Sequence, residues 1–249
     1  MKKCLFLILC ACLIALNVNA DPKKYWGRSF WQNATVQDVQ ELILTCQMFG
    51  QKEEIQKCYD DNLFNLVRDS KNSEIVETIV QAGANVNAQG VFKQTPLKVA
   101  IQNNFHDEIA AKLIELGAEV EQDDFEIACR FTKNPKIILL LLKHGAEVNK
   151  VNNDGYTPLI IAAQQNSNPE IITTIVEQGA NLMAKSTILG QTALHWAISM
   201  NKNPQIAGAL LDAGADINVI DDFGKKPIDY AKENKDFFNS DVYKRLIQY

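Results

Sequence analysis

The stretch from Gly155 to Asn181 reads GYTPLIIAAQQNSNPEIITTIVEQGAN and describes one complete unit of two helices. Thr157-Pro158 predicts the start of a first helix, because proline at the first helical position loses no hydrogen bond and already has a helical φ. Asn168-Pro169 predicts the start of a second helix, with Asn168 as its N-cap. Apolar residues then recur at helical spacing up to Gly179, where a left-handed residue ends the helix.

The same unit recurs along the chain. Glycine-alanine pairs mark the ends of five copies, at successive intervals of 34, 28, 34 and 35 residues: Gly83-Ala84, Gly117-Ala118, Gly145-Ala146, Gly179-Ala180 and Gly214-Ala215. Seventeen residues before each glycine lies one small or apolar residue of the first helix: Leu66, Ala100, Ala128, Ala162 and Ala197. A repeated unit of this length indicates a solenoid, in which each copy buries its apolar face against its neighbours.

Three motifs carry a family resemblance: Thr95-Pro96-Leu97, Thr157-Pro158-Leu159 and Thr192-Ala193-Leu194-His195. Together with the glycine-alanine turns and the period, they make the chain resemble the ankyrin-repeat family over residues 61–249. The resemblance implies a mainly α fold, an ankyrin-repeat solenoid of stacked helix-turn-helix units with β-turn fingers. We expect five repeats and a C-terminal capping repeat in residues 61–249.

Two details of the repeats lead to separate expectations. The third repeat is short, because Glu121 to Asp124 runs directly into Phe125 at the usual leucine position, so its finger should be missing. The turns between helices carry asparagines, such as Asn166 and Asn168 or Asn201 and Asn203, which we interpret as helix caps.

The N-terminal part of the chain precedes the repeats. Residues 1–20 have the pattern of a signal peptide, with a lysine-led start, a short apolar region and a cleavage site after Ala20. A lipoprotein signal at Cys12 is the weaker alternative. Residues 21–60 are expected to form a helical cap, in which Thr35 and Asp38 make a capping box. These features predict a periplasmic or secreted protein of bacterial type.

Charge excludes several classes of partner. The whole chain contains 25 Lys and Arg against 30 Asp and Glu, and removal of Lys2 and Lys3 with the leader makes the balance more acidic. An acidic chain without a basic cluster is not expected to bind nucleic acid or anionic membranes. No segment after residue 20 predicts a membrane span. We expect a monomer without cofactors.

Three cysteines remain after removal of the leader. Cys129 occupies a first-helix position that the family fills with small buried residues, so we interpret it as a core residue. Cys46 and Cys58 lie close in sequence and would enter an oxidising compartment. A disulfide between them and two free thiols are both open interpretations.

Nothing in the sequence indicates catalysis. His195 lies in the family's Thr-Pro-Leu-His position, which implies hydrogen bonds to neighbouring backbone rather than chemistry. Neither His106 nor His144 adjoins residues at metal-ligand spacing. Asp222-Phe223-Gly224 spells a kinase motif without the other kinase motifs. We therefore expect a protein that is not an enzyme and has no metal site.

A binding surface is the remaining function, because members of the family usually bind proteins with their fingers and with the exposed side of the first helices. On the fingers, the repeat frame places these residues in solvent: Val91, Phe92, Gln94, Asn153, Asp154, Tyr156, Ile188, Leu189, Gln191, Phe223 and Lys225. On the first helices it places Arg130, Phe131, Gln164, Gln165 and Met200, with Arg130 and Phe131 beside the missing finger.

Two interpretations of these residues remain open. The apolar tips are typical of interface anchors, but they can also pack against the adjacent finger. The leading hypothesis is an exported, non-enzymatic scaffold that binds an unidentified protein. The alternative is an enzyme or small-ligand protein with a pocket in the N-terminal segment, among Trp26, Trp31 and Cys58.

Overall fold

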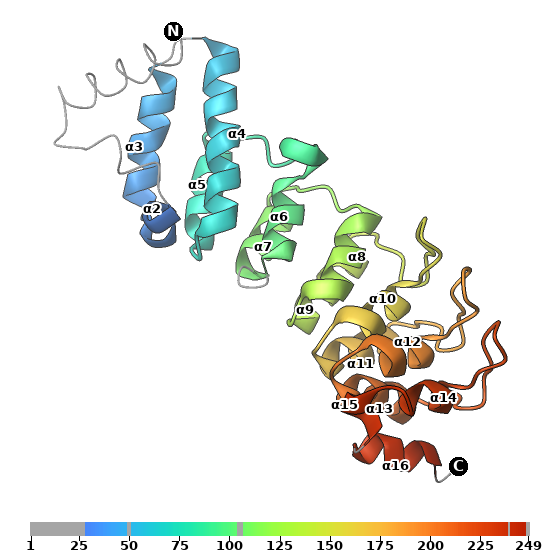
Figure 1. Ribbon diagram of the computed structural model, residues 1–249. Coiled ribbons are helices and arrows are strands. Elements are labelled where there is room, and N and C mark those ends of the chain that lie inside the picture. The colour runs from blue at the N-terminus through green and yellow to red at the C-terminus, as the bar shows by residue number, and fades with distance from the viewer. Residues whose placement is uncertain (1–27, 49–50, 104–106, 239, 248–249) are drawn as a thin grey trace, which may run out of the picture. The chain divides into compact units, whose positions relative to one another are not determined.

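The computed structural model describes residues 28–48, 51–103, 107–238 and 240–247 (Figure 1). The leader expected at residues 1–20, the lipoprotein cysteine Cys12 of the alternative, and Trp26 lie outside the described residues. The chain divides into two compact units, Met1–Glu119 (unit 1) and Val120–Tyr249 (unit 2). The secondary structure of the described residues is helical apart from one isolated β-bridge, between Lys185 and Thr192, so the expected mainly α solenoid is confirmed.

Unit 1 holds the N-terminal helices and the first two repeats. Its elements are α2 (Arg28–Asn33), α3 (Val36–Gln47), α4 (Lys52–Asp69), α5 (Ser73–Gln81), the 3₁₀ turn η2 (Val91–Lys93), α6 (Pro96–Gln102) and α7 (Asp107–Glu115). The first helices α4 and α6 pack together, and the second helices α5 and α7 do the same. The helix α3 packs on both α4 and α5, and therefore covers the side of the first repeat where a preceding repeat would lie.

The start of α3 follows from its capping residues. The Thr35 hydroxyl accepts a hydrogen bond from the Asp38 backbone N–H at 3.2 Å, and an Asp38 carboxylate oxygen accepts one from the Thr35 N–H at 3.0 Å, as the sequence predicts. The expected boundary between residues 60 and 61 falls inside α4, because residues 52–69 contain neither glycine nor proline and form one continuous helix.

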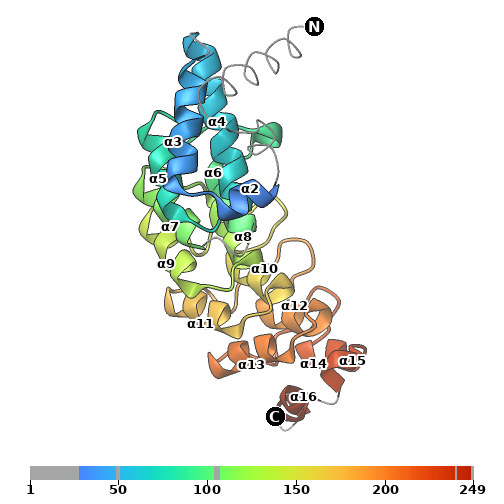
Figure 2. The ribbon, with the colours of Figure 1, turned by 90° about the vertical axis from the view of Figure 1, so that its left-hand side faces the viewer.

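Unit 2 holds the remaining repeats. Its helices are α8 (Gln122–Phe131), α9 (Pro135–Lys143), α10 (Pro158–Gln165), α11 (Pro169–Glu177), α12 (Ala193–Met200), α13 (Pro204–Asp212), α14 (Pro227–Ala231), α15 (Lys235–Phe238) and α16 (Asp241–Ile247). The first helices α8, α10, α12 and α14 pack in one row, and the second helices α9, α11 and α13 pack in another (Figure 2). The helix α16 packs on α13 and α14 at the end of the unit.

Small residues allow the first helices to lie close together. Ala128, Ala162, Ala197 and Ala231 occupy the same position in successive first helices, and none of them has measurable exposure. Larger apolar side chains fill the space on either side of this row. The alanine at this position therefore sets the spacing of the repeats, because a longer side chain would overpack the row.

The third repeat lacks its finger, as its sequence predicts. The helix α8 begins at Gln122, with Glu121 and Asp124 forming a capping box directly before the apolar face. Phe125 is fully buried and takes the place that Leu97, Leu159 and Leu194 hold in other repeats. The larger buried side chain of Phe125 thus stabilises the packing of α8, which has no finger before it.

Asparagines in the turns between helices join neighbouring repeats. The Asn166 side chain is fully buried, and its Nδ2 donates to the Cys129 carbonyl at 2.9 Å and the Thr132 carbonyl at 3.0 Å in the preceding repeat. Asn201 likewise donates to the carbonyls of Ala163 and Asn166, at 2.9 and 2.7 Å. The interpretation of these two residues as helix caps is therefore incomplete, since they satisfy carbonyls at the ends of the preceding first helices.

Candidate functional site

Three fingers of unit 2 project from the same side of its first helices, and each lies directly before one of them (Figure 1). In the first and the last of these fingers, a side chain at the base accepts hydrogen bonds from backbone N–H groups of the turn. Asn152 Oδ1 accepts hydrogen bonds from the N–H groups of Asp154 and Tyr156, both at 3.0 Å. In the last finger, Asp221 Oδ1 accepts from the N–H groups of Phe223 and Lys225, both at 2.9 Å. The fingers are therefore ordered turns.

Backbone hydrogen bonds join the three fingers into a row. The Thr187 N–H donates to the Gly155 carbonyl at 3.0 Å, and the Asp222 N–H donates to the Leu189 carbonyl at 3.1 Å. Gly155 has a φ of +78°, and a Cβ there would overlap the Thr187 side chain, so this close approach requires glycine. The row presents a fixed backbone to any partner.

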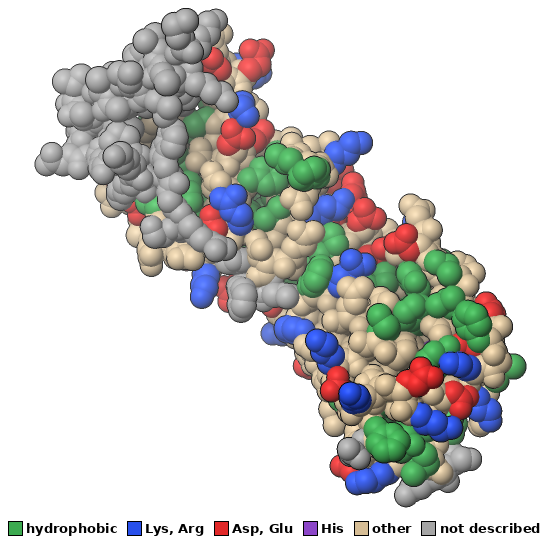
Figure 3. All heavy atoms as spheres, in the orientation of Figure 1, with side chains coloured by type: hydrophobic (Ala, Val, Ile, Leu, Met, Phe, Trp, Pro, Cys, Tyr) green, Lys and Arg blue, Asp and Glu red, His purple; other side chains and the backbone are tan. Residues whose placement is uncertain are grey.

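Apolar side chains are exposed on this row. Ile188 is 59% exposed and Phe223 is 67% exposed, and the hydrogen bond between Leu189 and Asp222 makes their fingers neighbours. Asn153 and Asp154 are also exposed, whereas Leu189 is half-buried. We call these five residues, Asn153, Asp154, Ile188, Leu189 and Phe223, the finger surface. In Figure 3, green side chains gather over the fingers and the adjoining first helices, with charged side chains around them.

Gln191 and Tyr156, both expected in solvent, make contacts within the protein. Gln191 is only 4% exposed, so its expected exposure is wrong: its Nε2 donates to Asp221 Oδ2 at 3.2 Å and to the Tyr230 hydroxyl at 2.9 Å. Tyr156 is half-buried, and its ring meets the Trp196 ring edge-on, with centroids 5.3 Å apart. Tyr156 therefore packs against the next repeat, which is the second of the two interpretations given for the finger residues.

The first helices of unit 2 carry a second set of expected residues. Arg130 and Gln164 are half-exposed, Phe131 is 38% exposed, and Met200 is 58% exposed. The exposed Gln165 donates through its Nε2 to Gln164 Oε1 at 2.9 Å. We call Arg130, Phe131, Gln164, Gln165 and Met200 the first-helix strip. An open depression of about 450 Å³ lies at its α12 end, between Met200, Tyr230 and Asn234.

The remaining expected residues belong to unit 1. Val91 is 74% exposed and Phe92 is 93% exposed, while Gln94 is half-buried and donates to Gln102 Oε1 at 3.2 Å. Phe92 and Lys93 have φ values of 59° and 58°, in the left-handed region where side chains are disfavoured. Lys93 stands where the first finger of unit 2 has Gly155. This finger therefore presents its aromatic tip on a strained turn.

Comparisons with known proteins agree with this architecture. The family model described as ankyrin repeats (3 copies) matches residues 125–248. Within those residues the structure shows paired helices stacked in two rows, with fingers between successive pairs. This chain belongs to the ankyrin-repeat family. Ankyrin repeats are generally protein–protein interaction modules and non-enzymatic scaffolds.

Three relatives share parts of this ankyrin chain. It is 32% identical over 134 residues to the ankyrin repeat protein FPV031 of Fowlpox virus (strain NVSL), covering 49% of this chain and 38% of the relative. It is 34% identical over 133 residues to Rabankyrin-5 of Mus musculus, covering 50% of this chain and 11% of the relative. It is 28% identical over 131 residues to the ANK repeat-containing protein nipk-1 of Caenorhabditis elegans, covering 45% and 21%. The chain spans well under half the length of each.

The ankyrin motif histidine has the structural surroundings that the family resemblance implies. His195 is fully buried, and its Nδ1 accepts from the Thr192 N–H at 3.2 Å. Its other ring nitrogen, Nε2, therefore carries the proton and donates to the Lys225 carbonyl at 3.2 Å. Burial lowers the pKa of His195, because the charged ring would be desolvated. A neutral His195 thus connects α12 to the last ankyrin finger.

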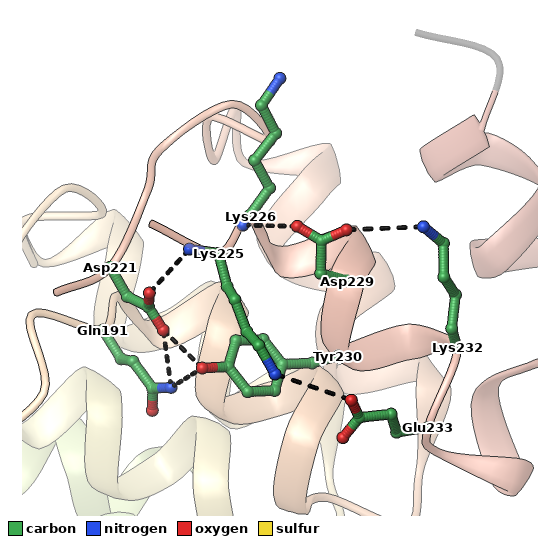
Figure 4. A network of polar contacts seen from close by, with 8 residues as sticks. All are labelled: Gln191, Asp221, Lys225, Lys226, Asp229, Tyr230, Lys232 and Glu233. Atoms are coloured by element: carbon green, nitrogen blue, oxygen red, sulfur yellow. Dashed lines mark hydrogen bonds and ion pairs between the residues drawn. The ribbon is translucent and has the colours of Figure 1, made fainter. Parts of the chain in front are cut away.

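A polar network fixes the last ankyrin finger to α14, and the sequence did not reveal it (Figure 4). The Tyr230 hydroxyl donates to Asp221 Oδ2, and the Lys225 ammonium lies 5.0 Å from the Tyr230 ring centroid and 3.6 Å from Glu233. Lys225, expected to face a partner, is therefore engaged within the repeat. Asp221 is recognisable only by its alignment with Asn152 at the base of the first finger of unit 2.

The network shifts the pKa values of Asp221 and Tyr230. Burial favours the protonated form of Asp221, but hydrogen bonds from Tyr230, the Lys225 N–H, Gln191 and the Phe223 N–H outweigh it and lower the pKa to about 2. Burial and the bond to Asp221 raise the pKa of Tyr230 to about 12. At neutral pH, Asp221 is therefore ionised and Tyr230 is protonated, and the hydrogen bond between them is kept.

Acid should weaken unit 2 through Asp221. Its folded-state pKa lies below the ordinary value of 3.8, so its contribution is complete above about pH 4 and is lost as pH falls towards 2. We expect this residue alone to account for on the order of 1 kcal/mol of the loss between pH 6 and pH 3. Urea unfolding at pH 6 and pH 3 tests it. The Asp221→Asn variant, although less stable at pH 6, should lose less stability on acidification than the unchanged chain; an equal loss would contradict the assignment.

Of the three residues named by the alternative hypothesis, the structure describes Trp31 and Cys58. Trp31 is 2% exposed and packs edge-on against Phe30, with ring centroids 4.9 Å apart. Cys58 forms a disulfide with Cys46, which joins α4 to α3. Within the described residues, no group of three His, Cys, Asp or Glu side chains is placed to hold a metal ion. No described helix has both the length and the apolar character needed to cross a bilayer.

Proposed function

We propose that this chain is an exported, non-enzymatic scaffold that binds a protein partner with the finger surface and the first-helix strip of unit 2. The observation that carries the proposal is the joining of the fingers by backbone hydrogen bonds, with Ile188 and Phe223 exposed on neighbouring fingers. A rigid backbone lowers the entropic cost of association, and exposed apolar side chains are the usual anchors of an interface.

Two features of the chain support export to the periplasm or out of the cell. Residues 1–20 have the pattern of a cleaved leader. The disulfide between Cys46 and Cys58 closes a short loop, and such bonds persist in oxidising compartments but are rare in the cytosol. We therefore propose that the mature chain begins at Asp21 and carries this disulfide.

The partner is identified by capture in the native compartment. A tagged chain is expressed in its own host, crosslinked on intact cells, and purified with the proteins attached to it. Mass spectrometry of the same sample reads the first residue of the chain and the state of Cys46 and Cys58. A start at Met1, or free thiols at both positions, would refute the export proposal without affecting the binding proposal.

Alanine at Ile188 and at Phe223 should each weaken binding of the captured partner by about 1 kcal/mol or more, because each side chain loses its burial against the partner. The melting temperature should change little, since both side chains are largely exposed. Thr173→Ala and Glu177→Ala on α11 are matched controls away from the fingers, and they should leave binding unchanged. Normal binding by both finger variants would refute the finger surface as the site.

A further inference from the structure

Arg130 differs from the other arginines whose side chains the structure describes. Arg68 pairs with Asp69 at 2.9 Å, and Arg245 pairs with Asp212 at 2.8 Å. Among the described residues, Arg130 has no hydrogen bond or ion pair, and its Nε is buried without a partner. Its one described neighbour of note is the Phe131 ring, whose centroid lies 5.9 Å from the guanidinium carbon. Buried donors are almost always satisfied, so this one calls for an explanation.

The neighbouring carboxylate is already used. Glu126 lies one helical turn before Arg130 on α8, the spacing at which opposite charges usually pair. Instead, Glu126 Oε2 accepts a hydrogen bond from Asn152 Nδ2 at 3.0 Å, at the base of the next finger. The guanidinium is therefore left half-exposed on the first-helix strip, next to Phe131 and without a counter-charge from the described residues.

The other end of the strip offers a different kind of contact. The depression of about 450 Å³ has Met200, which is 58% exposed, and Tyr230 as its apolar walls, and its other lining residues are polar: Ser199, Asn201, Lys202, Glu233, Asn234, Lys235 and Asp236. The helices α8, α10 and α12 pack side by side between Arg130 and this depression. At helix spacings of about 8–10 Å, the two sites lie roughly 16–20 Å apart.

We propose that the strip binds an extended segment of the partner, with a carboxylate on Arg130 and an apolar side chain in the depression beside Met200. This inference rests on the proposed function and specifies the chemistry of the partner. An extended chain advances about 3.3 Å per residue, so the acidic and the apolar residue are about five or six positions apart. Gln164 and Gln165 lie between the two sites and present amide groups to the intervening backbone.

A planar guanidinium is suited to this role. It binds a carboxylate through two parallel N–H donors, which gives both strength and orientation. The two terminal nitrogens, which are not among the buried atoms, supply these donors, while the buried Nε is left without a partner. Because the rest of the chain is acidic, with 30 Asp and Glu against 25 Lys and Arg, an acidic segment is attracted to this site specifically rather than to the surface as a whole.

A random dodecapeptide library displayed on phage provides the test, with the purified protein as bait. We expect enriched peptides to share an acidic residue followed or preceded, five or six positions away, by a large apolar residue. A selected peptide is then synthesised with its acidic residue and with the corresponding amide. The affinities of both peptides are measured on the unchanged protein and on Arg130→Gln.

The four affinities form a double-mutant cycle between the acidic residue of the peptide and Arg130. Replacing the acid by the amide should weaken binding at least tenfold on the unchanged protein and by less than twofold on Arg130→Gln. Raising the salt concentration should weaken the acidic peptide on the unchanged protein only, because a half-exposed ion pair is screened. Arg130→Lys, which keeps the charge but lacks the fork, should fall between the two. Arg245→Gln on α16, which removes an arginine that already has a partner, is the matched control and should bind like the unchanged protein.

Other outcomes separate the two proposals. If peptides are enriched but the acid-to-amide change costs the same on Arg130→Gln, the carboxylate inference is overturned and the proposed function stands. If Arg130→Gln fails to fold, the same comparison is made on Arg130→Lys. If Arg130→Lys binds the acidic peptide as tightly as the unchanged protein does, and the acid-to-amide change costs as much on both proteins, the inference is overturned. A protein that enriches no peptide overturns the inference of an extended segment, whereas the proposed function is decided by the capture experiment and the finger variants.

Discussion

Phe125→Ala should lower the free energy of unfolding of unit 2 by about 3–5 kcal/mol, because it removes a fully buried aromatic ring and leaves a cavity. The cost should lie towards the upper end of this range. The third repeat has no finger to close over its first helix, so the ring at Phe125 is the main apolar anchor at the start of α8. Denaturation in urea, followed by circular dichroism, measures the change.

Phe131→Ala provides a matched control for Phe125→Ala. The same side chain is removed from the same helix, but Phe131 is 38% exposed and lies at the last position of α8. We expect a loss below about 1 kcal/mol at this position, since a surface side chain contributes little to the core. Equal losses for the two variants would mean that the third repeat is not packed through Phe125.

Asn166→Asp should be nearly as damaging, with an expected loss of about 3–5 kcal/mol. The substitution keeps the shape of the side chain but replaces the Nδ2 donor by an acceptor oxygen. That oxygen would face the carbonyls of Cys129 and Thr132, in a site where Asn166 has no exposed surface. The result is a buried negative charge and two unsatisfied carbonyl groups.

Asn168→Asp tests whether this loss depends on the position of the asparagine. Asn168 Oδ1 caps α11 by accepting from the Glu170 N–H at 3.1 Å, and an aspartate can do the same. Its Nδ2 donates to the Lys133 carbonyl at the surface, where water can take over. We expect a change below about 1 kcal/mol. A loss as large as that of Asn166→Asp would show that general acidity of the turn, rather than the link between repeats, is responsible.

Local signals predicted most of the fold. Thr157-Pro158 and Asn168-Pro169 mark helix starts because proline and a capping side chain act within a few residues, and α10 and α11 begin at these prolines. The missing finger of the third repeat also follows directly from the residue count before Phe125. The expected 60/61 boundary falls inside α4, because a repeat frame gives the period of the chain, whereas the helix continues as long as the backbone permits.

The candidate site was harder to predict, because exposure depends on residues far away in sequence. Gln94 and Gln191 occupy equivalent finger positions, yet Gln94 is half-buried and bonds to Gln102, whereas Gln191 is buried by its bonds to Asp221 and Tyr230. Tyr156 faces Trp196, forty positions later. The repeat frame assigns each residue a position but does not say what its neighbour in the next repeat will be.

The asparagines that link the repeats also bear on how such a chain can lengthen. Asn201 lies 35 positions after Asn166 and reaches the corresponding carbonyls of the preceding repeat. A gene duplication that inserted a second copy of residues 167–201 would therefore bring both a new donor and the acceptors for the donor that follows. A copy of only part of a repeat would leave a buried amide facing the wrong part of the backbone. We therefore expect tandem growth by whole repeats to preserve stability, and partial copies to lose stability through unpaired polar groups.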